Sequence, residues 1–166
     1  MPGSMPASPS SGRGEPVIEI RPVRPTDYDA WLPLWDGYNE FYGRAGVTAL
    51  DPAITETTWK RFFDPGEPVF ALVADAGGSL EGLAHYLYHR STTRVEPVCY
   101  LQDLYTTPAR RGHGIGRALI EGAYAEARRA GLQRVYWQTQ ESNTPGRRLY
   151  ERIARHHGFI VYSHDV

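Results

Sequence analysis

Apolar residues recur along the chain with two different periods, which separate the expected strands from the expected helices. Runs with a period near two predict strands at 17–23, 69–75, 80–90 and 98–107. Steps of three and four residues predict a helix that Thr26 or Asp27 caps, a second over 51–64 and a third from about 114 to 130. Gly131 is a natural stop for the third helix.

The last third of the chain continues this alternation. It predicts a strand at 134–140, a helix that begins after Asn143 or Thr144 and ends before Gly158, and a closing strand at 159–166. The order of strands and helices is that of a mixed α/β layer in one domain, 16–166. Residues 1–15 are mostly Pro, Gly and Ser, and we expect a disordered tail there.

Composition and charge exclude several classes of protein for this chain. The net charge of −1 provides no field that would recruit nucleic acid or a membrane, and no apolar stretch has the length of a membrane span. The single cysteine, Cys99, excludes an internal disulfide, and no histidine pair has a convincing metal-ligand spacing. With no apolar export signal at the start, these features predict a cytoplasmic protein without a metal.

A glycine cluster joins the strand at 98–107 to the following helix. In the string RRGHGIGRAL, glycines occupy positions 112, 114 and 116. Glycines let an anion approach the backbone, and the first turn of a helix offers unpaired amides and a positive dipole. The alternative is a turn that only brings strand and helix close together. The predicted phosphate cradle comprises Arg111, Gly112, His113, Gly114, Ile115, Gly116 and Arg117.

This cluster resembles the acyl-CoA pyrophosphate loop of the GNAT superfamily of N-acetyltransferases. The family pattern is Gln or Arg, two residues, Gly, one residue, and Gly or Ala, which Arg111, Gly114 and Gly116 match. The stretch VYWQTQESN is further similar to spermidine/spermine and to histone or polyamine acetyltransferases.

A second stretch, NTPGRRLYERIARHHGF, resembles a later motif of the same family. Asn143 and Tyr150 occupy its Asn and Tyr positions, and Gly146 stands where Ala is usual. The resemblance implies a mostly antiparallel sheet, splayed between its fourth and fifth strands, with helices on both faces. It also implies acetyl-CoA as the donor and is compatible with a homodimer. Beyond the cradle, the residues implied to bind the cofactor are Leu104, Tyr105, Thr106, Asn143 and Gly146.

The same resemblance implies direct attack of a primary amine on the thioester. Tyr150 is the candidate acid for the departing thiolate, because a phenol is a donor at neutral pH. The base is open between Asp103, Glu141, His85 and water, since spermidine/spermine-type relatives have Glu where this chain has Gln102. We name Asp103 as the catalytic candidate beside Tyr150.

The aromatic region before residue 64 suits a cationic amine as well as a core, because it interleaves aromatic faces with carboxylates. The acceptor can be a small or polyamine-like amine or a protein lysine. A second class of function is an acyl-CoA-binding sensor without turnover, which Gln102 leaves open and Tyr150 disfavours. The predicted substrate-binding residues are Trp35, Tyr38, Tyr42, His85 and Glu141.

Overall fold

A mixed sheet organises the chain. The computed structural model describes residues 16–166, so the predicted tail at 1–15 lies outside the described residues. Within the described part, five strands pair in the order β1-β2-β3-β4-β5, with β5 parallel to β4 and every other pair antiparallel. This is the mostly antiparallel sheet that was expected. The strands are β1 (Glu19–Pro22), β2 (Val69–Asp75), β3 (Leu80–His89), β4 (Val98–Thr106) and β5 (Val135–Tyr136).

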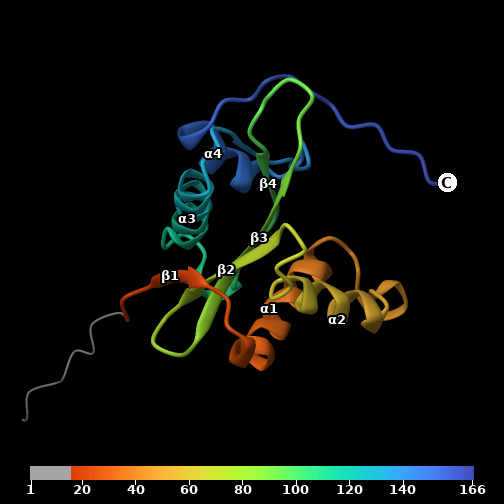
Figure 1. The fold of residues 1–166 in the computed structure, drawn as a ribbon. Helices are drawn as coiled ribbons and strands as arrows, with labels where there is room; N and C mark the ends of the chain where they lie inside the picture. Colours follow the sequence, from red (N-terminus) through yellow and green to blue (C-terminus); the bar gives the residue numbers. More distant parts are fainter. Residues whose placement is uncertain (1–15) are drawn as a thin grey trace, which may run out of the picture.

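Helices cover both faces of this sheet (Figure 1). α1 (Tyr28–Phe41) and α2 (Pro52–Arg61) lie on one face, while α3 (Ile115–Arg129) and α4 (Thr144–Ile153) lie on the other. Short 3-10 turns precede α1, α2 and α3, at Pro25–Asp27, Gly46–Thr48 and Pro108–Arg110. None of the helices in 16–166 has the length and apolar character needed to cross a membrane.

Two apolar clusters fix the helices to the sheet. Leu119, Ile120 and Ala123 of α3 pack against β2, β3 and β4, together with Cys99. Cys99 is fully buried, and burial raises the pKa of its thiol to about 12. Trp31 of α1 anchors the cluster on the other face. α1 and α3 therefore each turn toward the sheet the apolar stripe that their sequences predict.

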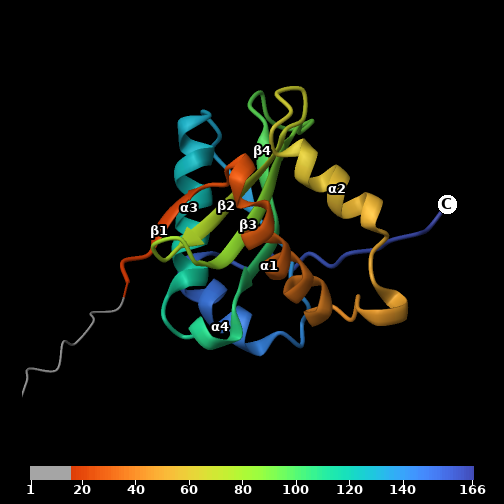
Figure 2. The ribbon, with the colours of Figure 1, turned by 90° about the horizontal axis from the view of Figure 1, so that it is seen from below.

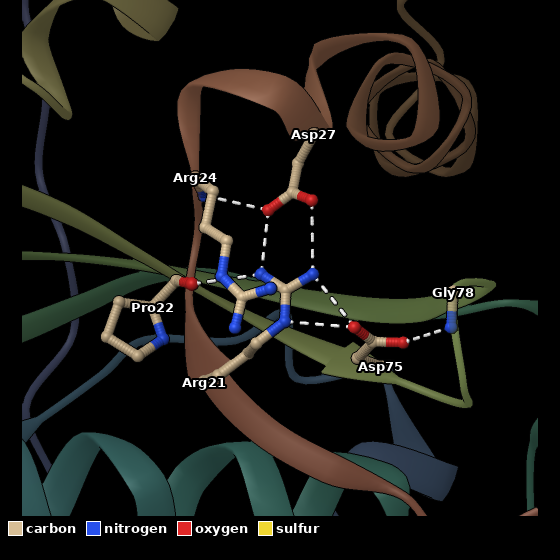
Figure 3. A network of polar contacts seen from close by, with 6 residues as sticks. All are labelled: Arg21, Pro22, Arg24, Asp27, Asp75 and Gly78. Atoms are coloured by element: carbon tan, nitrogen blue, oxygen red, sulfur yellow. Dashed lines mark hydrogen bonds and ion pairs between the residues drawn. The ribbon is translucent and has the colours of Figure 1, made fainter.

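An ion-pair network ties β1 to the turn after β2 (Figure 3). The buried Arg21 guanidinium donates to both carboxylate oxygens of Asp27 at 2.7 and 3.1 Å and to Asp75 at 2.9 Å. The amide of Gly78 donates to Asp75, and the amide of Arg24 donates to Asp27. Arg21 lowers the pKa of Asp27, whose carboxylate is thus engaged here and makes no capping bond to α1.

Two predictions near the C-terminus differ from the structure. The strand expected at 134–140 is reduced to Val135–Tyr136, and the strand expected at 159–166 does not form. A strand needs a neighbour, and β4 pairs with β5 only through Cys99 and Tyr100. Apolar alternation reports the tendency of a segment to form a strand, whereas the partner has to come from elsewhere in the fold.

Candidate active site

The loop between β4 and α3 presents open backbone at the start of a helix. Gly112 and Gly114 adopt φ values of +80° and +82°, and no protein atom lies within 4 Å of where a Cβ would sit at either position. No acceptor in residues 16–166 takes a hydrogen bond from the backbone amides of 112–117. These unpaired amides lie at the positive end of α3, and such a donor set fits a diphosphate.

Positive side chains surround this cradle. The Nε atom of Arg110 is buried and has no hydrogen-bond partner within the described residues. Arg111 stacks its guanidinium over the Tyr105 ring, 5.8 Å from the centroid. Arg117 is exposed and pairs with Glu121 at 2.8 Å. A buried donor without a partner is rare in folded proteins.

The sheet opens immediately beside the cradle. β5 ends at Tyr136, whereas β4 continues to Thr106 and pairs there with β3 alone. The predicted splay is confirmed, and one edge of Leu104, Tyr105 and Thr106 has no neighbouring strand within 16–166. Pairing of pantetheine with this edge stays a prediction. A pocket in the gap is lined by Tyr42, Leu101, Gln102, Leu104, Trp137, Gln138 and Tyr150.

Tyr150 reaches this pocket from α4. Its ring packs edge-on against Trp137, with centroids 5.4 Å apart. Burial, with a smaller contribution from Tyr42, raises the pKa of Tyr150 to about 12. The phenol therefore keeps its proton at neutral pH and can donate it to a group in the gap.

A β-bulge directs Asp103 toward α1. His85 lies opposite Asp103, but the next residue, Tyr86, lies opposite Leu101. Gln102 is therefore an extra residue in β4 and is exposed. In a regular strand Leu101 and Asp103 would share one face. The bulge instead leaves Leu101 in the core beneath α3 and places Asp103 beside His85 on the α1 face.

A buried chain of hydrogen bonds holds the Asp103 carboxylate. The indole nitrogen of Trp31 donates to Nε2 of His85 at 2.9 Å, and Nδ1 of His85 lies 3.0 Å from Oδ2 of Asp103. An indole can only donate, so Nε2 of His85 accepts and the ring proton is on Nδ1, which donates to Asp103. His85 thus lies behind Asp103, with both ring nitrogens engaged.

Asp103 and Arg44 shift the pKa values of Tyr38 and Tyr42 in opposite directions. Burial raises the pKa of Tyr38 and of Tyr42, and the negative charge of Asp103 raises both further. The Arg44 guanidinium lies 5.6 Å from the ring centroid of Tyr38 and 5.4 Å from that of Tyr42, and it opposes these shifts. Sequence reasoning missed Arg44, although a cation two residues beyond Tyr42 was a signal for it.

Trp35 packs against this arrangement, with its ring centroid 5.2 Å from that of His85, whereas Glu141 lies apart from it. Trp35 is buried, stacks on Trp31 and Tyr38, and donates its indole N–H to Thr55 at 3.1 Å. These contacts give Trp35 a packing role. Glu141 is exposed, and the structure brings it to no other predicted site residue. Contact of Trp35 or Glu141 with the acceptor stays a prediction.

Asn143 and Gly146 have a structural role at the start of α4. The side-chain oxygen of Asn143 caps the helix by accepting from the amide of Gly146 at 3.2 Å, and its amide nitrogen donates to Thr139 at 2.9 Å. A Cβ on Gly146 would come within 2.6 Å of that amide nitrogen. The pair thus sets the start of the helix that carries Tyr150, while direct contact with the cofactor stays a prediction.

The cradle, the splayed strands and the pocket are the parts that an acyl-CoA-dependent acyltransferase requires. Residues 31–154 match the family model described as "Acetyltransferase (GNAT) family". The chain belongs to this family and is an acyl-CoA-dependent N-acetyltransferase with acetyl-CoA as the donor. Within 16–166, no group of three or more His, Cys, Asp or Glu side chains is placed to hold a metal ion.

Two known acetyltransferases are similar in sequence to most of this chain. D-amino-acid N-acetyltransferase HPA3 of Saccharomyces cerevisiae is 35% identical over 150 residues, which cover 89% of this chain and 91% of the relative. A mycothiol acetyltransferase of Salinispora arenicola is 33% identical over 155 residues, 90% of this chain but 47% of its own length. The predicted likeness to spermidine/spermine and histone-type members is not confirmed.

Solved structures share the fold at low sequence identity. The aminoglycoside acetyltransferase AAC(6')-Iy, in complex with a bisubstrate analog, has a TM-score of 0.75 at 16% identity and covers 90% of this chain and 99% of its own. A structure described as a transcriptional regulator from Bacillus halodurans has a TM-score of 0.76 at 17% identity, covering 90% of this chain and 100% of its own. These likenesses establish the GNAT fold.

Proposed function

We propose that this acetyltransferase acts on the primary amine of a small molecule that also carries a carboxylate, as an amino acid does. The observation that carries the proposal is the opposite charge of Asp103 and Arg44 beside the same tyrosine pair. A carboxylate suits an ammonium group and a guanidinium suits a carboxylate. The yeast relative, a D-amino-acid N-acetyltransferase, supports this class of acceptor.

In the proposed reaction, Asp103 and Tyr150 move the two protons. The acceptor ammonium pairs with Asp103, which takes one proton directly or through a water molecule. The nitrogen then attacks the thioester carbonyl, so the C–N bond forms and the C–S bond breaks, and the nitrogen releases its second proton to water. Tyr150 gives its phenolic proton to the thiolate sulfur and regains one from solvent. His85 and Trp31 position Asp103 and do not exchange protons.

The proposal predicts that Asp103→Asn lowers kcat/KM for amino acids about 100-fold, with little change in the KM for acetyl-CoA. The asparagine oxygen can still accept from His85, so the buried hydrogen bonds survive. The deficit should shrink as the pH approaches the pKa of the acceptor amine, because less ammonium then needs deprotonation. Steady-state kinetics across pH measure both effects.

The matched control is Asp36→Asn, which removes an exposed carboxylate from the same region of the fold. This variant should keep wild-type kinetics. Equal kinetics for Asp103→Asn and wild-type protein at neutral pH would show that Asp103 is not the base.

Arg44→Gln tests recognition of the acceptor carboxylate. We expect the KM for an amino acid to rise about 10- to 100-fold, the worth of a hydrogen bond to a charged group. The KM for the corresponding amino-acid amide, which has no carboxylate, should hardly change. An equal rise for both acceptors would instead indicate a structural role of Arg44 in packing Tyr38 and Tyr42.

An acceptor panel tests the proposed function as a whole. Release of free thiol from acetyl-CoA is measured with D- and L-amino acids, their amides, a polyamine and a lysine peptide. The proposal expects amino acids to exceed their amides in kcat/KM. Preference for the polyamine or the peptide would overturn the carboxylate requirement. Tight CoA binding without thiol release for any amine would favour the sensor alternative.

We also infer a cytoplasmic location. The single cysteine, Cys99, is buried and forms no disulfide, which fits a reducing compartment but does not by itself identify one. Fractionation of the source cells with an antibody against the chain would test this location.

A further inference from the structure

A row of large side chains crosses three strands on the α1 face of the sheet. Leu87, Tyr100 and Tyr136 stand directly opposite one another on β3, β4 and β5, so their side chains share one face. The residue before Tyr100 is Cys99, which packs beneath α3. Because successive side chains of a strand alternate between faces, the row lies on the opposite face, that of α1.

This row takes no part in either apolar cluster of residues 16–166. Leu87, Tyr100 and Tyr136 are absent from the clusters that fix α1 and α3, and each stays partly exposed. Figure 2 shows α1 and α2 on the side of the strands opposite to α3, and in Figure 1 the hairpin that joins β3 to β4 extends beyond both helices. Apolar and aromatic surface that the core does not use, close to polar groups of a site, is typical of a ligand pocket.

The Tyr136 ring is held in a fixed position. It stacks on the Tyr100 ring with the centroids 5.1 Å apart and the planes inclined by 27°. Nδ1 of His89 lies 2.9 Å from the carbonyl oxygen of Arg90, which can only accept. In the neutral imidazole, Nε2 of His89 therefore accepts from the Tyr136 hydroxyl at 2.8 Å. The Arg134 guanidinium lies 5.5 Å from the Tyr136 ring centroid. Rings held in this way lose little freedom when a ligand packs on them.

The row continues into the site at Asp103. Gln102 is the extra residue of the β-bulge, and Leu101 faces α3. Tyr100 and Asp103 therefore follow one another along the α1 face of β4. Burial raises the pKa of Tyr100, and the charges that raise it further include those of Asp103 and Tyr42. The aromatic row and the proposed base thus belong to one continuous surface.

We propose that this row is the subsite for the acceptor side chain, and that the acceptor is an amino acid whose side chain is aromatic. The inference rests on the proposed function: with the ammonium at Asp103 and the carboxylate at Arg44, the side chain is the part left to place. Tyr100 adjoins Asp103 on the same face, so a short α-carbon branch reaches it. The stacked pair of Tyr100 and Tyr136 offers a third ring the offset and edge-on contacts that aromatic groups prefer.

Steady-state kinetics of the wild-type protein test the subsite first. Each amino acid is supplied as the enantiomer that gives the higher kcat/KM. We expect kcat/KM for phenylalanine to exceed that for leucine about 3- to 10-fold and that for alanine at least about 10-fold, because a ring adds aromatic contacts to the burial of apolar area. A value for phenylalanine no higher than that for leucine would overturn the proposal. A preference for glutamate, whose side chain would pair with Arg134, would overturn it as well.

Tyr100→Ala tests the assignment of the subsite to this row. The variant should lower kcat/KM for phenylalanine about 10-fold and change that for alanine less than about 2-fold. The matched control is Tyr88→Ala, which removes a tyrosine ring from the other face of the sheet and should keep the wild-type preference. Thermal unfolding shows whether both variants fold, and the wild-type comparison decides the question if they do not. An equal loss for both acceptors, or a preference for phenylalanine that survives in Tyr100→Ala, would refute the assignment.

Amides of the same amino acids separate this inference from the proposed function. Phenylalaninamide and leucinamide keep the side chains and lack the carboxylate. An aromatic preference in both series, with the amides as good as the acids, would support the subsite and contradict the carboxylate requirement. Acids that exceed their amides without any aromatic preference would keep the proposed function and refute the subsite.

Discussion

Gly114→Glu is expected to weaken binding of acetyl-CoA at least about 1,000-fold, since placing like charges together costs several kcal/mol. Gly114 caps α3 with φ +82° and faces open space where the diphosphate is expected. The substitution brings a carboxylate into that space and forces a left-handed backbone on a residue with a Cβ. Isothermal titration calorimetry with CoA measures the loss directly.

Gly131→Glu is the matched control for this substitution. Gly131 follows the other end of α3, has φ +77°, and likewise has no protein atom near its Cβ position. Gly131→Glu therefore adds the same charge and imposes the same backbone strain, but at a distance from the cradle. Gly114→Ala separates backbone strain from charge and should lose less affinity than Gly114→Glu. Equal CoA affinity of Gly114→Glu and Gly131→Glu would refute the phosphate cradle.

Tyr150→Phe is expected to lower kcat about 100-fold while CoA affinity changes little. The phenylalanine ring keeps the contact with Trp137 and removes only the phenolic proton. Pre-steady-state measurement of thiol release isolates the chemical step. Tyr124→Phe is the control, because the phenol of Tyr124 lies by the carbonyl of Ile153 outside the pocket. Unchanged thiol release in Tyr150→Phe would exclude the acid role.

The raised pKa of Tyr150 gives the same variant a second measurable effect. Burial raises the pKa to about 12 from 10.0, so the folded state holds this proton more tightly than the unfolded state. The resulting stabilisation is complete below pH 10 and is lost as the pH rises from 10 through about 12. Over that range, the free energy of unfolding of wild-type protein should fall relative to that of Tyr150→Phe. Urea unfolding at a series of pH values measures the difference.

Local sequence patterns predicted the glycine loop and the helix that carries Tyr150. The Gly112–Gly114 loop was recognisable because positive φ angles and open backbone need glycine, which the sequence displays directly. Tyr150 was recognisable from its distance to Asn143 within one helix. Both predictions concern neighbours along the chain, for which helical geometry converts sequence spacing into position.

The sequence did not predict on which face of the sheet the Asp103 side chain lies. It depends on the bulge at Gln102, which exists only because β4 pairs out of register with β3. Arg44 likewise gained its place beside Tyr38 and Tyr42 from the turn after α1. Trp35 and Tyr38 share one apolar stripe, and only packing against α2 gave the Trp35 indole a partner, Thr55.

The sequence by itself thus determined the order of strands and helices as far as α4, the family, the glycine cradle and the helix that carries Tyr150. The tertiary structure alone decided which way Asp103 faces, where the two strands part, and that residues 159–166 find no partner in their own sheet. The physical reason is the range of the interactions. Periodicity and turn chemistry act between near neighbours, whereas strand register and edge pairing join segments far apart in the chain.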